Sequence, residues 1–160
     1  MASYRLIFGI LIGIILSFLS VFFFNMESIL NQIEINLTLS DPNFLKAIAL
    51  LIGANFKFDI IAFFTGTSEF LVAQLLAWLF IGYVSGTISK GLRRGVIAGL
   101  LVVVLDMLLW IILNILSGED LMVLFSVQLS ETLGGIISAL LGASIGGLIG
   151  GLISGPYEEF

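Results

Sequence analysis

Four runs of apolar residues, each about as long as one bilayer-spanning helix, constrain the fold more than any other feature. They cover residues 6–24, 69–89, 95–117 and 132–155. A helix needs ~20 apolar residues to cross the hydrocarbon core of a membrane, because each residue adds only about 1.5 Å of length. The sequence therefore predicts an all-α integral membrane protein with four transmembrane helices, forming a single membrane domain over residues 1–160.

The composition also favours a bilayer environment. Hydrophobic residues make up 59% of the 160-residue chain, and charged residues only 11%. A soluble domain of this size could not bury that much apolar surface, because small folded domains leave much of their surface exposed to water. The lipid bilayer is therefore the first expected partner. The formal net charge of −5 argues against nucleic acid as a partner, because nucleic-acid binding depends on basic surfaces.

The chain contains neither cysteine nor histidine. This excludes disulfide bonds, thiolate zinc sites and histidine-ligated haem, and it also excludes Ser-His and Cys-His nucleophile pairs. We therefore expect no metal and no cofactor, and we do not expect an enzyme. No soluble small-molecule substrate is evident from the sequence.

The basic residues predict the orientation of the bundle. In a four-span arrangement, Arg5, Lys90, Arg93 and Arg94 all fall on one side. Loops rich in lysine and arginine stay in the cytoplasm, so a multi-pass protein of the cell membrane with both termini cytoplasmic is expected. The segment 42–64 is open to three interpretations: interfacial, re-entrant or a fifth span. A fifth span would move the basic connection 90–94 to the outside, which favours the four-span arrangement.

Residues 25–68 are expected to form a small cap outside the membrane, with helices that lie on its surface or dip into it. An amphipathic helix over 42–53 would begin at Asp41-Pro42, a pair typical of helix N-termini. Two segments in which apolar and polar residues alternate are candidates for short strands that would complete the cap. These are 32–39 in the first outer loop and 125–130 in the second outer loop, 118–131.

Four spans, a long first outer loop, a shorter second one and strands in both resemble claudin-like tetraspan proteins in outline. The resemblance is architectural only. The claudin loop motif, with its tryptophan and paired cysteines, is absent, so no function follows from it.

Small residues recur every four positions along the fourth run, in two adjacent rows. One row is Ser138, Gly142, Gly146, Gly150 and Ser154, and the other is Gly135, Ala139, Ala143, Gly147, Gly151 and Gly155. Lipid supplies little hydrophobic force between helices, so close backbone packing must supply the attraction. Shorter seams occur in the other runs, at Gly9 and Gly13, Gly82 and Gly86, and Gly95 and Gly99. The rows predict close helix packing, either within the bundle or against a second copy or another subunit.

Asp106 stands at the centre of the third run, in the sequence LVVVLDMLLW. A carboxylate at that depth costs at least ~2.5 kcal/mol, so it should point into the bundle, on the face that it shares with Gly95 and Gly99. No predicted span contains lysine, arginine or histidine, so we expect a neutral acid that is hydrogen-bonded to polar side chains. The candidates for this intramembrane polar site are Ser17, Gln74, Asn114 and Ser144.

Three roles are open for Asp106: a hydrogen-bonding contact between helices, an ion pair with a cation from a partner subunit, and a proton or cation relay. The first functional expectation is a membrane scaffold or accessory subunit that self-associates, or binds partner helices, through its glycine-rich faces. The alternative is a small proton or cation channel or carrier that uses Asp106. A membrane-embedded enzyme comes third.

Overall fold

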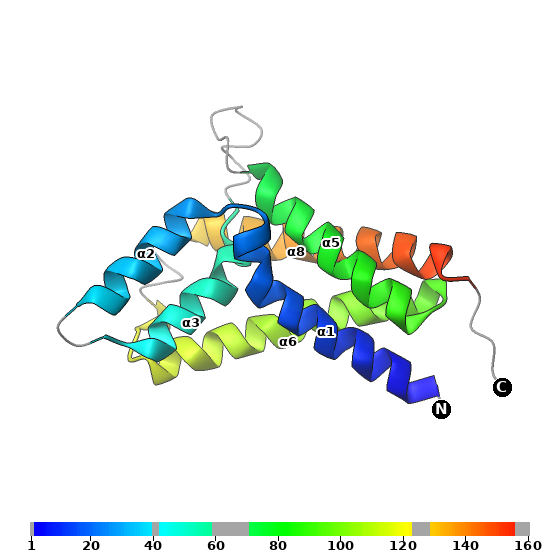
Figure 1. Cartoon of the computed structure of the whole chain (residues 1–160), viewed down its shortest axis with the longest axis horizontal. Helices are drawn as coiled ribbons and strands as arrows, with labels where there is room; N and C mark the ends of the chain where they lie inside the picture. The colour runs from blue at the N-terminus through cyan, green and yellow to red at the C-terminus, as the bar shows by residue number, and fades with distance from the viewer. Residues whose placement is uncertain (1, 40–41, 59–70, 123–128, 156–160) are drawn as a thin grey trace.

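The computed structural model describes residues 2–39, 42–58, 71–122 and 129–155. All regular structure in these ranges is helical, and the long helices lie side by side in a bundle (Figure 1). In chain order the elements are α1 (Ala2–Phe23), α2 (Glu27–Thr38), α3 (Phe44–Gly53), the 3₁₀ turn η1 (Ala54–Phe56), α5 (Leu71–Ser89), α6 (Leu92–Leu116) and α8 (Leu129–Ile153).

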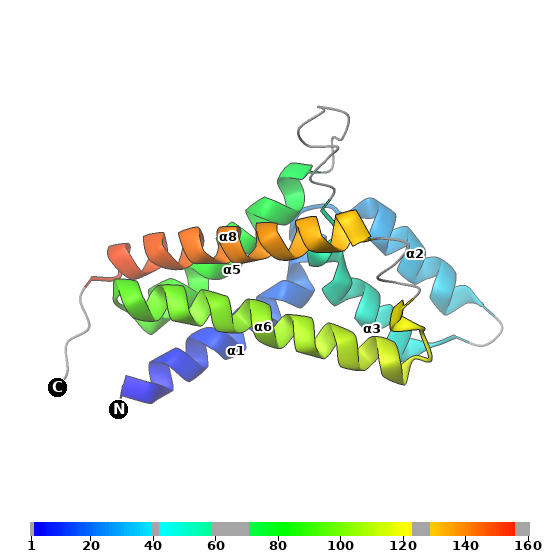
Figure 2. The ribbon, with the colours of Figure 1, turned by 180° about the vertical axis from the view of Figure 1, so that it is seen from behind.

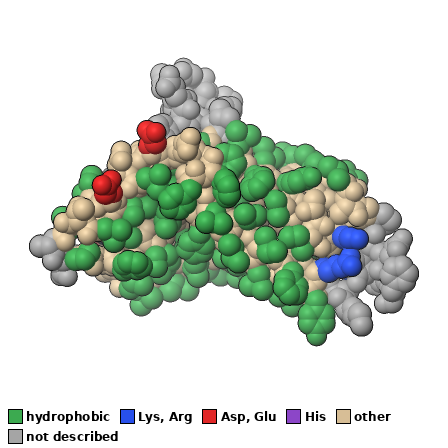
Figure 3. Space-filling view, in the orientation of Figure 1, with side chains coloured by type: hydrophobic (Ala, Val, Ile, Leu, Met, Phe, Trp, Pro, Cys, Tyr) green, Lys and Arg blue, Asp and Glu red, His purple; other side chains and the backbone are tan. Residues whose placement is uncertain are grey.

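Within the described ranges, three helices are long and apolar enough to cross a membrane. They are Tyr4–Phe23 in α1, Leu92–Leu116 in α6 and Glu131–Ile153 in α8. The second predicted span corresponds to α5, whose apolar stretch Ala73–Ser89 is shorter than these. Hydrophobic side chains cover most of the face shown in Figure 3. These features together are typical of a membrane protein.

The core lies where α5, α6 and α8 meet, with α1 covering α5 and α6 (Figure 2). Phe56 of η1 is buried there, and its ring centroid lies 5.3 Å from that of Trp78, on α5. The 3₁₀ turn thus enters the bundle from the α3 side and contacts both α5 and α8. Because α2 and α3 pack against each other and α3 also packs against α6, the segment after α1 is part of the folded core.

The predicted strand at 32–39 is wrong, because α2 covers this segment as a helix. Its buried residues are Ile29 and Asn36, seven positions apart, which is a helical spacing. Ile35 and Leu37 point outward and are 62% and 41% exposed. Alternation predicts a strand only when one side of the segment is polar, and here the exposed Ile35 and Leu37 show that apolar side chains also occupy the outward side of α2.

The second candidate strand, 125–130, lies mostly outside the described residues, and its last two residues, 129 and 130, belong to α8. No strand is present in the ranges that the structure describes. The outline that resembled claudin-like proteins therefore lacks its strands in those ranges.

The helix predicted over 42–53 is present as α3, but its N-cap is Asn43 and not Asp41. The Asn43 side-chain oxygen accepts from the Lys46 backbone N–H at 3.1 Å, and its amide nitrogen donates to the Ser117 carbonyl oxygen at 3.0 Å. Residues Ala47, Ala49 and Ile52 are buried, so α3 packs on α6 with its apolar face inward.

Replacing Asn43 with alanine should lower the free energy of unfolding by about 1–2 kcal/mol, because the N-cap and the bond from α3 to the end of α6 are both lost. Denaturant unfolding in mild detergent measures this change. The variant Asn43→Asp keeps the capping oxygen and loses only the amide donor, so its free energy of unfolding should fall by less than that of Asn43→Ala. Equal stability of wild type and Asn43→Ala would contradict the role given to this residue.

Candidate functional site: the buried carboxyl of Asp106

Asp106 lies in the middle of α6 and is completely buried. Val102, one turn earlier on the same face, is also buried, whereas Leu105 and Leu108 on other faces are exposed. The inward face of α6 packs against α1. Gly13 of α1 lies so close to Val102 that a Cβ added to this glycine would be 2.5 Å from the valine side chain. The helical phase of α6 therefore directs the carboxyl toward α1.

The carboxyl has the Ser17 side chain beside it and no cation. The two side chains interact, while the Ser17 hydroxyl also donates to the Ile14 carbonyl oxygen at 2.7 Å, within α1. Neither carboxyl oxygen of Asp106 has a well-aligned hydrogen bond with any described residue, and no salt bridge involves this side chain in those ranges. A buried carboxylate without a cation or a donor is strongly destabilised, so the neutral, protonated form is favoured at this position.

A cluster of bonded polar groups adjoins this position, on the α1 side. The amide nitrogen of Asn55 donates to the Ser17 carbonyl oxygen at 2.8 Å, and its amide oxygen accepts from the Ser20 hydroxyl at 2.8 Å. The indole N–H of Trp78 donates to the Asn55 backbone oxygen at 2.9 Å. This cluster joins α1, η1 and α5, and it satisfies polar groups that would otherwise be buried without partners.

Replacing Asn55 with alanine should lower the free energy of unfolding by about 2–3 kcal/mol. The Ser17 carbonyl oxygen and the Ser20 hydroxyl would each lose a buried partner. Thermal unfolding in mild detergent measures the loss. Ser28 on α2 is exposed and serves as a control, because Ser28→Ala should have an effect within ±0.5 kcal/mol. A melting temperature unchanged in Asn55→Ala would contradict the bonding described for the cluster.

The other predicted site residues lie apart from the carboxyl. Gln74 is buried on α5, and its amide oxygen has no partner among the described residues. Asn114 is buried on α6 and donates to the Trp110 carbonyl oxygen at 2.7 Å. Ser144 is half-buried on α8. Of the four predicted neighbours, the structure brings Ser17 next to Asp106, where the two side chains interact, and no interaction joins Gln74, Asn114 or Ser144 to the carboxyl among the described residues.

Sequence reasoning missed Ser20, Asn55 and Trp78 as a polar group next to the site. Asn55 is 35 residues from Ser20 and 38 from Ser17 along the chain, so no local spacing links them. The available signal was that Ser17 and Ser20 share one helical face of α1. The buried polar groups on that face needed a hydrogen-bonding partner from another segment, but the sequence did not indicate which residue would provide it.

The first row of α8 faces α5. An added Cβ on Gly146 would collide with the Leu79 carbonyl oxygen, and one on Gly150 with that of Tyr83. At Gly142 it would lie 2.8 Å from the Trp78 Cβ. These glycines therefore let the backbones of α5 and α8 approach closely.

The second row of α8 lies between α5 and α6. A Cβ added to Gly86 of α5 or to Gly95 of α6 would collide with the Gly147 carbonyl oxygen. A Cβ added to Gly82 of α5 or to Gly99 of α6 would likewise collide with the Ala143 carbonyl oxygen. The remaining positions also contact the chain itself or are buried in it: Gly135 against Phe56, Gly151 against Gly91, Gly9 against Ser85 and Ser89, Gly13 against Val102, and Ala139 fully buried.

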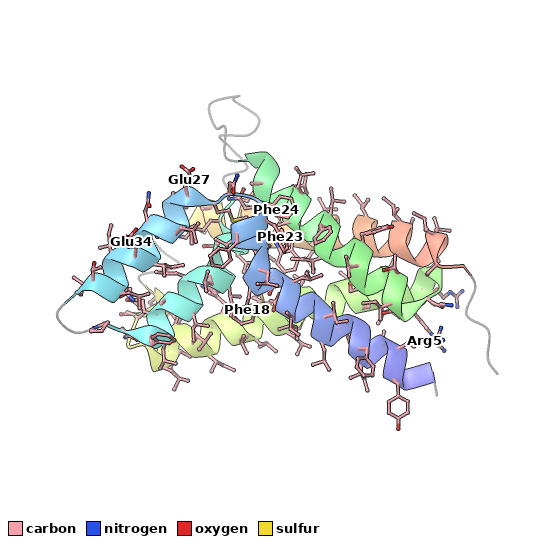
Figure 4. All side chains as sticks on the ribbon, viewed as in Figure 1. Arg5, Phe18, Phe23, Phe24, Glu27 and Glu34 are labelled. Carbon is pink, nitrogen blue, oxygen red and sulfur yellow. The ribbon has the colours of Figure 1, made fainter. Side chains whose placement is uncertain are left out.

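Charged residues gather at opposite ends of the bundle. Figure 4 shows Arg5 near the start of α1, at the opposite end from Glu27 and Glu34 on α2. The turn between α5 and α6, which carries Lys90, lies at the same end as Arg5 (Figure 1). Figure 3 shows the same separation on the molecular surface.

The described chain is thus a helical bundle with three helices that could span a membrane and, in one of them, a buried carboxyl that no cation pairs. Comparison of the chain with protein families, with curated proteins and with solved structures gave no match. The geometry of this site therefore carries the functional argument.

Proposed function

We propose that this chain is a small multi-pass membrane channel or carrier that moves protons, with Asp106 as the group that binds them. The observation that supports this proposal is the complete burial of a carboxyl that has no cation, and only the Ser17 side chain beside it, among the described residues. A carboxyl retained only as a contact between helices would be expected to have its oxygens satisfied by well-aligned donors, and neither oxygen of Asp106 has one in those residues. Ionisable groups inside membrane helices commonly mark ion pathways and proton relays.

The proposal includes four spans, with α5 as the fourth, and both termini in the cytoplasm. The first residues of α1 and the last residues of α8 lie at the same end of the bundle (Figure 1). Arg5 and the basic turn that contains Lys90 are at that end as well. The tendency of basic loops to remain in the cytoplasm supports this orientation.

Buried hydroxyl groups supply polar positions between the basic end and Asp106. Ser85 and Ser89 are fully buried on α5, next to Gly9 of α1. Their hydroxyls donate to carbonyl oxygens of α5, at 3.1 Å and 2.7 Å. In the proposed mechanism, water that enters along these hydroxyls exchanges protons with Asp106, and the low polarity of the surroundings returns the carboxyl to its neutral form.

Proton flux into liposomes tests the proposal. Vesicles that contain the purified chain and a pH-sensitive dye should acidify under an imposed membrane potential faster than protein-free vesicles. Asp106→Asn should reduce the protein-dependent rate at least tenfold. Asp120→Asn provides a matched control, because Asp120 is exposed in the loop after α6 and the same chemical change there should leave the rate unaltered. Equal flux through wild type and Asp106→Asn would refute the role of Asp106.

The scaffold or accessory-subunit function remains the second proposal, together with a homo-oligomer or a complex with other membrane subunits. Except for Gly155, where an added Cβ would have no other residue close to it, the glycines on which it was based contact other parts of the same chain. A partner would therefore have to bind through the bulkier outward faces. Native mass spectrometry from mild detergent distinguishes the two proposals: a stable oligomer or a bound partner would favour the scaffold, and a monomer with proton flux would favour the carrier.

A further inference from the structure

A cavity of about 220 Å³ lies between the α2–α3 hairpin and the last turns of α6. Its polar lining residues come from five parts of the chain. They are Gln32 of α2, Lys46 of α3, Lys57 after η1, Trp110 and Asn114 of α6, and Glu119 of the following loop. The cavity is at the end of the bundle opposite to Arg5, and Asp106 does not line it.

The two lysines of the cavity differ in their partners. The Lys46 ammonium pairs with the Glu119 carboxylate at 2.5 Å, so the charges of these two residues offset each other. The Lys57 side chain makes no ion pair with any described residue and is half-buried, although its charge is attracted by the Glu131 carboxylate. Among the described residues that line the cavity, Lys57 is therefore the charged one that no lining residue pairs, because Glu131 does not line it.

The surroundings of Lys57 are unfavourable for a cation in the absence of a ligand. Burial lowers the pKa of its ammonium, and the carboxylate of Glu131 opposes that shift. Lys57 follows the turn η1, which is fixed in the core by Phe56 and Asn55, so the lysine backbone is held beside the cavity that its side chain lines. An anion in the cavity would supply a counter-charge from the cavity side.

We infer that this cavity binds a small anionic group, a carboxylate or a phosphate, with Lys57 as its counter-ion. The volume is several times the ~30 Å³ that one water molecule occupies, so it can hold such a group with some of its hydration. The side-chain amides of Gln32 and Asn114 can donate hydrogen bonds to the anion, and the Trp110 ring forms an apolar wall. A lysine ammonium binds phosphate as a point charge, which suits a cavity in which one lysine is not paired by a lining residue.

The same chemistry is available from two sources. One is a soluble anion, and the other is the headgroup of an anionic lipid next to the hairpin. The inference does not rest on proton binding at Asp106, because Lys57 and Asp106 belong to different parts of the bundle.

Calorimetric titration with sodium phosphate tests the inference on the full chain in a neutral detergent, with sodium chloride matched for ionic strength. Saturable binding is expected for wild type. It should weaken at least tenfold in Lys57→Gln and persist in Lys57→Arg, which keeps the charge. Lys90→Gln serves as the control, because it removes one positive charge at the other end of the molecule.

Nanodiscs then separate the two sources. If the ligand is soluble, phosphate should bind equally well in phosphatidylcholine discs and in discs that contain phosphatidylglycerol. If it is a lipid headgroup, the anionic discs should abolish phosphate binding to wild type, because the cavity is already filled. Either result supports an anion site. The absence of saturable phosphate binding to wild type in detergent and in phosphatidylcholine discs would overturn the inference, as would equal binding by Lys57→Gln.

Discussion

Replacing Gly147 with leucine is expected to prevent the bundle from folding. A Cβ at Gly147 would collide with the Gly95 carbonyl oxygen and would lie 3.2 Å from the Val96 Cα. The obstructing atoms are backbone atoms, so no side chain can rotate away to make room. Overpacked cores typically lose about 1–3 kcal/mol, and we expect this substitution to exceed that range because two helices must separate.

The test is the yield of monodisperse protein in mild detergent, followed by denaturant unfolding of whatever is recovered. Gly147→Ala should be recovered, with a loss of about 1–3 kcal/mol, because it adds only the Cβ. Ile145→Phe adds bulk on the same helix at a side chain that is 50% exposed, and it should fold normally. Wild-type stability of Gly147→Leu would show that α8 does not pack between α5 and α6 in the way described.

Replacing Asp106 with asparagine should leave the bundle as stable as wild type, or more stable by up to about 2 kcal/mol, while it removes proton flux. At most the contact with the Ser17 side chain is lost, because neither carboxyl oxygen has a well-aligned hydrogen bond among the described residues. The amide has nearly the same shape as the carboxyl, and it cannot ionise in the low-polarity interior. Denaturant unfolding at neutral pH, on the same preparations that are used for flux, measures the stability.

The sign of this change separates the three roles open to Asp106. A hydrogen-bonding contact between helices predicts a loss of about 1 kcal/mol in Asp106→Asn, because a contact across the interface would be weakened. An ion pair with a partner subunit predicts a loss of assembly. A relay predicts preserved or increased stability together with loss of transport. A clear destabilisation of Asp106→Asn would therefore favour the contact over the proposed relay.

The sequence predicted the long helices well, because a sustained apolar run leaves the backbone few alternatives in lipid. The predicted span 95–117 is α6 (Leu92–Leu116), and 132–155 is α8 (Leu129–Ile153). The short connection between α5 and α6 was also expected. Its backbone reverses at Lys90 and Gly91, which have positive φ angles of 51° and 86°. Glycine favours that conformation, and at Lys90 the tight turn imposes it.

Features that depend on distant contacts could not be predicted. The sequence pattern of α8 showed two rows of small residues, but it did not show that α5 and α6 would cover both of them. Likewise, Asn55 lies in a stretch without a clear pattern, and its role depends on reaching α1 across the core. The helix α2 was missed because alternation was interpreted as though its outer side faced water.

Infrared difference spectroscopy of the Asp106 carbonyl stretch tests the central claim most directly. The account predicts a band of the protonated carboxyl at neutral pH that is absent from Asp106→Asn. It also predicts that this band shifts when H₂O is exchanged for D₂O, because the proton must reach bulk water. An ionised carboxylate at neutral pH, or a protonated band that never exchanges, would contradict a proton-carrying role for this side chain.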